Sequence, residues 1–164
     1  MLRIVAIVLA SMLAGCVGQP REEAAAPAPA APAGDGYAVT PGTPQGDDAL
    51  YRALGGLPAI TAVVDEALAQ IGNDLRINLL FADSDMKYVR ARLIEQICAG
   101  TGGPCTYTGL SMEEAHSGQD IKPEEFGYFV EDLVAAMDKL KVPAKQQQDL
   151  LALLGSMQGQ VVGQ

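Results

Sequence analysis

Apolar residues recur at helical spacing through most of the sequence after residue 47, and this repeat is the strongest constraint on the fold. Aliphatic side chains fall three and four residues apart, as one face of an α-helix requires. Glycine or proline separates these segments, and none has the alternation of a strand. The pattern therefore predicts an all-α domain. Helices are expected over residues 49–54, 58–71, 86–99, 112–116, 123–141 and 144–161, with Asp47 and Asp48 capping the first and a short helical turn carrying Leu79–Phe81.

Residues 1–15 are typical of an export signal, because Arg3 precedes an apolar run that is too short for a comfortable membrane span. Leu13-Ala14-Gly15-Cys16 resembles the bacterial lipobox, which implies cleavage before Cys16 and lipidation of its thiol. The alternative is an ordinary secretory signal with an incidental cysteine. We expect a protein that is exported to the bacterial cell envelope and lipid-anchored to a membrane, on its periplasmic face.

Residues 16–46 carry six of the ten prolines, interleaved with alanine and glycine. Such a segment has little apolar bulk to bury, so we expect an extended, disordered tether. The folded domain is then predicted at residues 47–164.

The net charge of −9 argues against a nucleic-acid partner, which would need a basic surface. One histidine and three cysteines leave no His-rich site and no Cys₄ zinc site. The residues around His116 do not have the spacing of a Ser–His–Asp or Cys–His catalytic arrangement, so acid–base catalysis is poorly supported. Taken alone, His116 is a surface or helix-end residue.

The order of motifs around His116 changes that interpretation. The motifs are, in chain order, Leu50-Tyr51, Gly55-Gly56, Phe81, Asp85-Met86, Gly102-Gly103-Pro104, Tyr107-Thr108-Gly109, Met112, His116 and Val142-Pro143. This series resembles the group I truncated haemoglobins over about residues 49–162.

The resemblance implies a truncated globin, a two-over-two helical sandwich around haem b, with His116 as the iron ligand. It also implies a set of side chains that contact the haem, among which Arg92 matches a cationic position that can pair with a propionate. Ordinary core packing, or a solvated charge for Arg92, is the alternative at each position. The implied contacts are Phe81, Val89, Arg92, Leu93, Ile97, Met112, Phe126, Phe129 and Leu133.

The distal side departs from the family pattern. Ala67-Leu68 replaces the usual Phe-Tyr pair, Leu93 stands at the usual glutamine position, and Val89 is expected to face the ligand. Tyr88 should point away. With Leu68, Val89 and Leu93 forming an apolar distal pocket, dioxygen would lack a charge-assisted hydrogen bond, while carbon monoxide and nitric oxide would lose less. Nitric-oxide dioxygenation, which needs long retention of dioxygen, is therefore in doubt.

Cys98 and Cys105 bracket a glycine-rich segment, and with Cys16 assigned to lipid they remain as a pair. Export permits a disulfide between them, and two reduced thiols are the alternative.

We expect a haem protein that binds a diatomic gas (O₂, NO or CO) for transport or sensing rather than a dedicated enzyme. One alternative is an envelope haem redox protein, an electron carrier or weak peroxidase, with Met86 or Met112 as sixth ligand and an unknown redox partner. Another is a haem-free helical lipoprotein that acts as a binding module.

Overall fold

A computed structural model of the chain describes residues 39, 42–43 and 46–164. The expected export signal (1–15), Cys16 and nearly all of the expected tether (16–46) lie outside the described residues, so the structure does not test those predictions. Among the described residues, no helix combines the length and the apolar character needed to cross a membrane.

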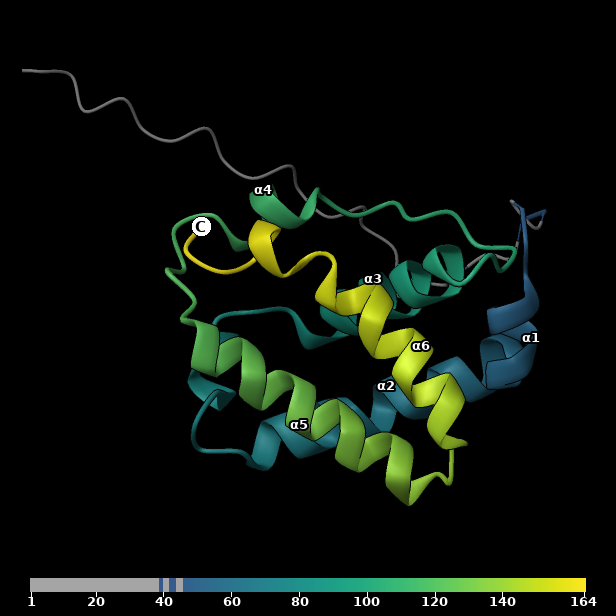
Figure 1. The fold of residues 1–164 in the computed structure, drawn as a ribbon. Helices are drawn as coiled ribbons and strands as arrows, with labels where there is room; N and C mark the ends of the chain where they lie inside the picture. Colours follow the sequence, from purple (N-terminus) through teal and green to yellow (C-terminus); the bar gives the residue numbers. More distant parts are fainter. Residues whose placement is uncertain (1–38, 40–41, 44–45) are drawn as a thin grey trace, which may run out of the picture. The chain divides into compact units, whose positions relative to one another are not determined.

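Helices make up nearly all of the regular structure in the described part of the chain, which contains no strand. This confirms the predicted all-α class (Figure 1). The elements are α1 (Ala49–Leu54), α2 (Gly56–Asn73), the 3₁₀ turn η1 (Asn78–Phe81), α3 (Met86–Gly100), α4 (Met112–His116), α5 (Pro123–Lys139), α6 (Ala144–Gly155) and the 3₁₀ turn η2 (Gln158–Gln160).

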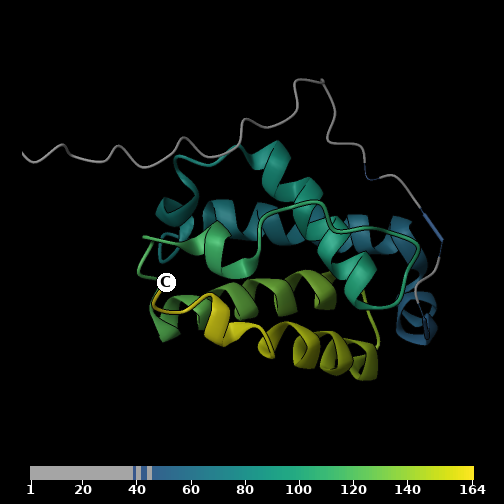
Figure 2. The ribbon, with the colours of Figure 1, turned by 90° about the horizontal axis from the view of Figure 1, so that it is seen from above.

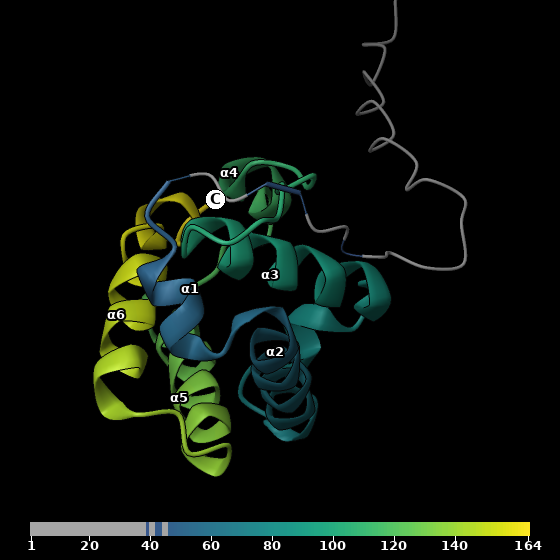
Figure 3. The same cartoon turned by 90° about the vertical axis from the view of Figure 1, so that its right-hand side faces the viewer.

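The four longest helices form two layers. Helices α2 and α3 lie together on one side, and α5 and α6 lie together on the other (Figures 2 and 3). Helix α2 packs against both α3 and α5, while α6 contacts α1 and α5. The two-over-two arrangement expected from the sequence is therefore present.

The core lies between the layers and follows the predicted apolar stripe of α2. Buried α2 side chains meet buried side chains of α5, of which Met137 and Ala136 are completely enclosed. Burying one Val, Leu, Ile or Met side chain completely stabilises the folded state by about 1.5–3 kcal/mol. The principal contributors are Ile60, Val63, Val64, Ala67, Ile94, Leu133, Met137 and Leu150.

Short-range contacts explain the start of the fold. Asp47 caps α1, because its Oδ1 accepts a hydrogen bond from the backbone N–H of Ala49 at 3.0 Å. Asp48 makes no such bond and instead pairs with Arg52 at 2.9 Å. Gly55 and Gly56 have φ values of 99° and 71°, which side chains disfavour, so this pair makes the sharp turn into α2.

Helix α5 ends two residues earlier than the sequence predicts. Leu140 is the C-cap of the helix, and Lys141 follows with a φ of 58°. The N–H of Val142 donates to the carbonyl of Met137 at 2.9 Å, and that of Lys141 donates to Asp138 at 3.0 Å. These two bonds form a Schellman motif, which satisfies the last carbonyls of the helix before Val142-Pro143 is reached.

Helix α6 also ends early, at Gly155 rather than near Val161. The Ser156 hydroxyl donates to the carbonyl of Leu153 at 2.6 Å, so a side chain replaces the missing helical donor. The chain then continues into η2, which packs beside α4.

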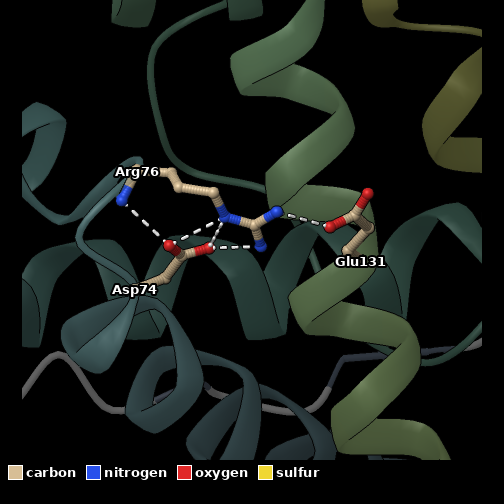
Figure 4. Close-up of polar contacts among 3 residues, drawn as sticks. All are labelled: Asp74, Arg76 and Glu131. Carbon is tan, nitrogen blue, oxygen red and sulfur yellow. Dashed lines mark hydrogen bonds and ion pairs between the residues drawn. The ribbon is translucent and has the colours of Figure 1, made fainter.

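Arg76 fastens the turn after α2 to α5 (Figure 4). Its Nη2 lies 2.7 Å from Asp74 and its Nη1 lies 2.8 Å from Glu131 on α5. Its guanidinium also lies over the Tyr128 ring, 4.1 Å from the centroid. These hydrogen bonds hold the pKa of Asp74 below its ordinary value. The position of η1, which follows directly, is thereby fixed relative to α5.

The loop between α3 and α4 is held by a disulfide. Cys98 and Cys105 are joined as the sequence analysis expected, with 5.7 Å between their Cα atoms, and both are almost fully buried. Gly103 lies inside this loop, where a Cβ atom would collide with the Tyr51 ring and stand 2.8 Å from the carbonyl oxygen of Cys98. The second glycine of the Gly-Gly-Pro motif is thus required by close packing.

Replacing both Cys98 and Cys105 by serine should lower the free energy of unfolding by about 2–3 kcal/mol, the entropy expected for a loop of this length. Urea unfolding of the oxidised protein and the variant measures the difference. Reduced wild-type protein serves as the control and should unfold like the variant. Two free thiols in the denatured, unreduced, exported protein would contradict the disulfide.

Candidate functional site

A cavity of about 340 Å³ opens between α3, α4 and α5. Its volume lies in the range of pockets that enclose small molecules and cofactors. Side chains from η1 and from the C-terminal segment complete the wall, which is largely aliphatic and aromatic. The apolar members include Ile77, Leu80, Phe81, Val89, Leu93, Leu110, Met112, Ile121, Phe126, Phe129, Leu154 and Met157.

His116 lies on this wall at the end of the short helix α4. A reciprocal cap starts that helix: the hydroxyl oxygen of Ser111 accepts from the Glu114 N–H at 3.2 Å, and Glu114 accepts from the Ser111 N–H at 3.0 Å. Hydrogen bonds from Ser111 also hold the pKa of the Glu114 carboxyl below its ordinary value. The cap fixes the single turn that presents His116.

The orientation of the imidazole is set by its own helix. Its Nδ1 lies 2.7 Å from the carbonyl oxygen of Met112, one turn earlier. A carbonyl oxygen can only accept, so in the neutral imidazole Nδ1 carries the proton and Nε2 keeps its lone pair. A histidine whose second nitrogen is bonded in this way is the usual arrangement of a metal-ligating imidazole.

The structure brings most of the predicted site residues to one wall. Eight of the ten predicted cofactor contacts line the cavity, drawn from η1, α3, α4 and α5. They are Phe81, Val89, Arg92, Leu93, Met112, His116, Phe126 and Phe129.

Three predicted residues do not line the cavity. Ile97 and Leu133 are 3% and 2% exposed and belong to the core, and Leu68 is half-buried against that same core. On helix α3 the lining residues include Leu93, one turn before Ile97, and end at Gln96. Ile97 falls on the flank that turns inward.

The expectation that Tyr88 points away is wrong, since Tyr88 also lines the cavity. It lies three residues after Asp85 and four before Arg92, on the same face of α3. The guanidinium carbon of Arg92 lies 5.2 Å from the centroid of its ring. The cavity covers a wider arc of α3 than the sequence predicts.

Arg92 sits in a buried polar network that the sequence did not predict. Its Nη2 donates to the Glu95 carboxylate at 2.9 Å, and its Nη1 donates to the hydroxyl oxygen of Thr108. Glu95 is only 4% exposed and also accepts from the Thr108 N–H at 2.9 Å. The Nε of Arg92 is buried and has no hydrogen-bond partner.

Two further polar side chains on the wall were missed. Gln96 donates to the sulfur of Met112 at 3.0 Å, and Tyr107 donates to the carbonyl of Leu110 at 2.7 Å. Burial raises the pKa of the Tyr107 hydroxyl above its ordinary value. Tyr107-Thr108-Gly109 stood out as a motif in the sequence, which was the available signal for Tyr107 and Thr108. Gln96 carried no signal.

The donor set limits what the cavity can hold. Among the residues that the structure describes, no three His, Cys, Asp or Glu side chains gather as a metal site. His116 offers one nitrogen inside an apolar cavity, and Arg92 places a cationic guanidinium at its wall. A cofactor that brings its own metal donors, an apolar body and carboxylate groups fits these features, and haem b is such a cofactor.

Comparison with known proteins agrees with this chemistry. The family model described as bacterial-like globin matches residues 49–162. A group 1 truncated hemoglobin from Nostoc sp. (strain MUN 8820) is 31% identical over 113 residues, which cover 69% of this chain and 96% of the relative. One from Mycolicibacterium paratuberculosis is 26% identical over 108 residues, covering 66% and 79%.

Solved structures agree as well. The Fe(III) form of the truncated hemoglobin from Tetrahymena pyriformis superposes with a TM-score of 0.68 at 25% identity, covering 70% of this chain and 98% of that one. The 2/2 hemoglobin from Synechococcus sp. PCC 7002 gives 0.62 at 26% identity, covering 66% and 92%. The chain belongs to the bacterial-like globin family, as a truncated globin similar to the group 1 truncated haemoglobins.

Proposed function

We propose that this globin holds haem through His116 and binds a diatomic gas at the iron. The observation that carries the proposal is the geometry of His116, whose Nδ1 bond to the Met112 carbonyl leaves Nε2 available on the wall of an apolar cavity. When bound, haem supplies an iron atom with one coordination position left for a gas. Haem is the cofactor of the family to which the chain belongs.

The chain's own residues would hold the cofactor by packing and by charge. Phe81, Phe126 and Phe129 offer flat apolar surface, and the aliphatic side chains exclude water from the cavity. Arg92 is the cationic side chain on the wall, and its guanidinium can pair with a propionate. Met112 orients His116 through its backbone oxygen.

We also propose that the protein retains dioxygen weakly compared with carbon monoxide. Val89 and Leu93 line the cavity at the positions that the family resemblance assigns to the ligand side, and neither can donate a hydrogen bond. A charge-assisted hydrogen bond contributes about 1.5–3 kcal/mol. Its absence at these two positions favours gases that depend less on such a bond.

The redox alternative would require a second protein ligand to the iron besides His116. Met86 is 37% exposed and does not line the cavity. Met112 lies one turn from His116 on the same short helix, so both side chains approach from the same side. Neither methionine favours an electron carrier over a gas-binding protein.

The amino-terminal sequence supports a location for this activity. We propose that the chain is exported, lipidated at Cys16 and tethered to the bacterial envelope by residues 16–46. The support is the Leu-Ala-Gly-Cys sequence after a short apolar run. Several acyl chains at about 0.8 kcal/mol per buried CH₂ give a lasting anchor.

The His116→Ala variant should lose haem affinity by at least about tenfold, because even the loss of a group that orients a metal ligand has an effect of this size. Absorption spectra of the ferric, ferrous and CO-treated protein measure it, with Ser117→Ala as the neighbouring control. Retention of the wild-type spectrum by His116→Ala would contradict the proposed ligand. A wild-type protein that shows no Soret band when haem is supplied would favour the haem-free alternative.

Replacing Val89 by glutamine should slow the release of dioxygen by about ten- to a hundredfold, with little change for carbon monoxide, because a donor is added to an apolar wall. Stopped-flow dissociation from the ferrous protein gives both rates. The matched variant is Tyr88→Phe, which should leave both rates nearly unchanged. A tenfold faster release of dioxygen from Tyr88→Phe would instead make Tyr88 the donor and overturn the apolar distal pocket.

Replacing Cys16 by serine should move the protein from the membrane fraction to the soluble envelope fraction, because the lipidated thiol is gone. Fractionation, together with labelling by a fatty-acid analogue, measures this in the bacterial host. Cys98→Ser serves as the control and should remain membrane-bound. An unlabelled wild-type protein in the soluble fraction would contradict lipidation.

A further inference from the structure

The buried carboxylate of Glu95 has no function in the gas-binding proposal, yet it lies against the cavity wall. Its side chain is only 5% exposed, and both oxygens are used. Oε1 accepts from Arg92 at 2.9 Å, and Oε2 accepts from the Thr108 N–H at 2.9 Å and the Thr108 hydroxyl at 3.0 Å. A buried carboxylate is costly unless it is paired and hydrogen-bonded in this way.

The bonds among these three residues close into a ring. Arg92 donates to the hydroxyl oxygen of Thr108, and that hydroxyl can donate its own proton to Glu95. Arg92 also donates directly to Glu95. Every group in the ring therefore has a consistent donor or acceptor assignment, and the guanidinium is held in one place.

Two further contacts confine Arg92. The Tyr88 ring lies 5.2 Å from the guanidinium carbon, on the cavity side of α3. At Gly109, an added Cβ would stand 2.9 Å from Cδ of Arg92, so the backbone presses closely on the stem. The Nε remains buried without a partner, although the rest of the side chain is firmly held.

We propose that Glu95 is a positioning residue for cofactor retention. It locks the loop that carries Thr108 onto α3 and holds the guanidinium of Arg92 at the cavity wall, ready to donate to a cofactor carboxylate. This inference rests on the proposed haem binding. Glu95 itself does not touch the cavity, and it acts through Arg92.

The Glu95→Gln variant tests this arrangement because it preserves shape but removes the charge. An amide has a single oxygen, so either Arg92 or the Thr108 N–H loses its acceptor. Transfer of haem from the protein to an excess of apomyoglobin should become about ten times faster, the usual effect of losing a group that orients a ligand-binding residue. Thr108→Val provides a second, milder disruption of the ring and should also speed transfer.

A double-mutant cycle separates positioning from general destabilisation. In an Arg92→Leu background, Glu95→Gln should change the transfer rate by less than about twofold, because the residue through which it acts is gone. The matched control is Asp65→Asn, which removes the partner of Arg90 on the exposed face of α3 and should leave transfer unchanged. Equal acceleration by Glu95→Gln with and without Arg92, or no acceleration in either background, would overturn the proposal.

Hydrogen exchange of the haem-free protein gives an independent readout. The Thr108 amide should exchange faster in Glu95→Gln, whereas the Glu114 amide, capped by Ser111, should be unaffected. Unchanged protection at Thr108 would overturn the loop-locking part of the proposal. If the wild type takes up no haem, the proposed function fails, and this exchange experiment still decides whether Glu95 locks the loop.

Discussion

Helix α3 has to satisfy two environments at once, and the rest of the structure depends on how it does so. One flank carries Ala91, Ile94 and Cys98 into the core against α2. The other carries Val89, Leu93 and Gln96 to the cavity. Since the helix is packed on its core side, the cavity wall cannot collapse inward to fill the space. The pocket is therefore maintained in part by burial on the core side of α3.

The part of the wall that carries His116 is organised by local hydrogen bonds instead of by a large core. Helix α4 is too short to be stable alone, and it relies on the Ser111–Glu114 cap and on contact with η2. Its histidine is oriented by a backbone oxygen of the same turn. A few polar contacts therefore fix the position of α4, whereas apolar packing fixes the position of α3.

Periodicity was enough to predict the helices, because apolar spacing reports which face is buried. It predicted the ends less well. Lysine does not favour a left-handed backbone conformation, yet Lys141 adopts one at the end of α5. At the end of α6, the Ser156 side-chain hydroxyl forms the terminating hydrogen bond. Family resemblance predicted most of the cavity wall. It could not predict Glu95, because a buried carboxylate and a solvated one look alike in a sequence until their partners across the loop are known.

The disulfide makes the state of the molecule depend on the compartment in which the chain is produced. It closes a ring of eight residues just before the segment that carries Thr108 and leads to His116. A chain produced in a reducing cytoplasm would carry two buried thiols at this place, whereas an exported chain would carry a cross-link. The two preparations would share one sequence but differ in the stiffness of the loop that leads to His116. Cofactor affinities measured on one preparation would therefore not apply to the other.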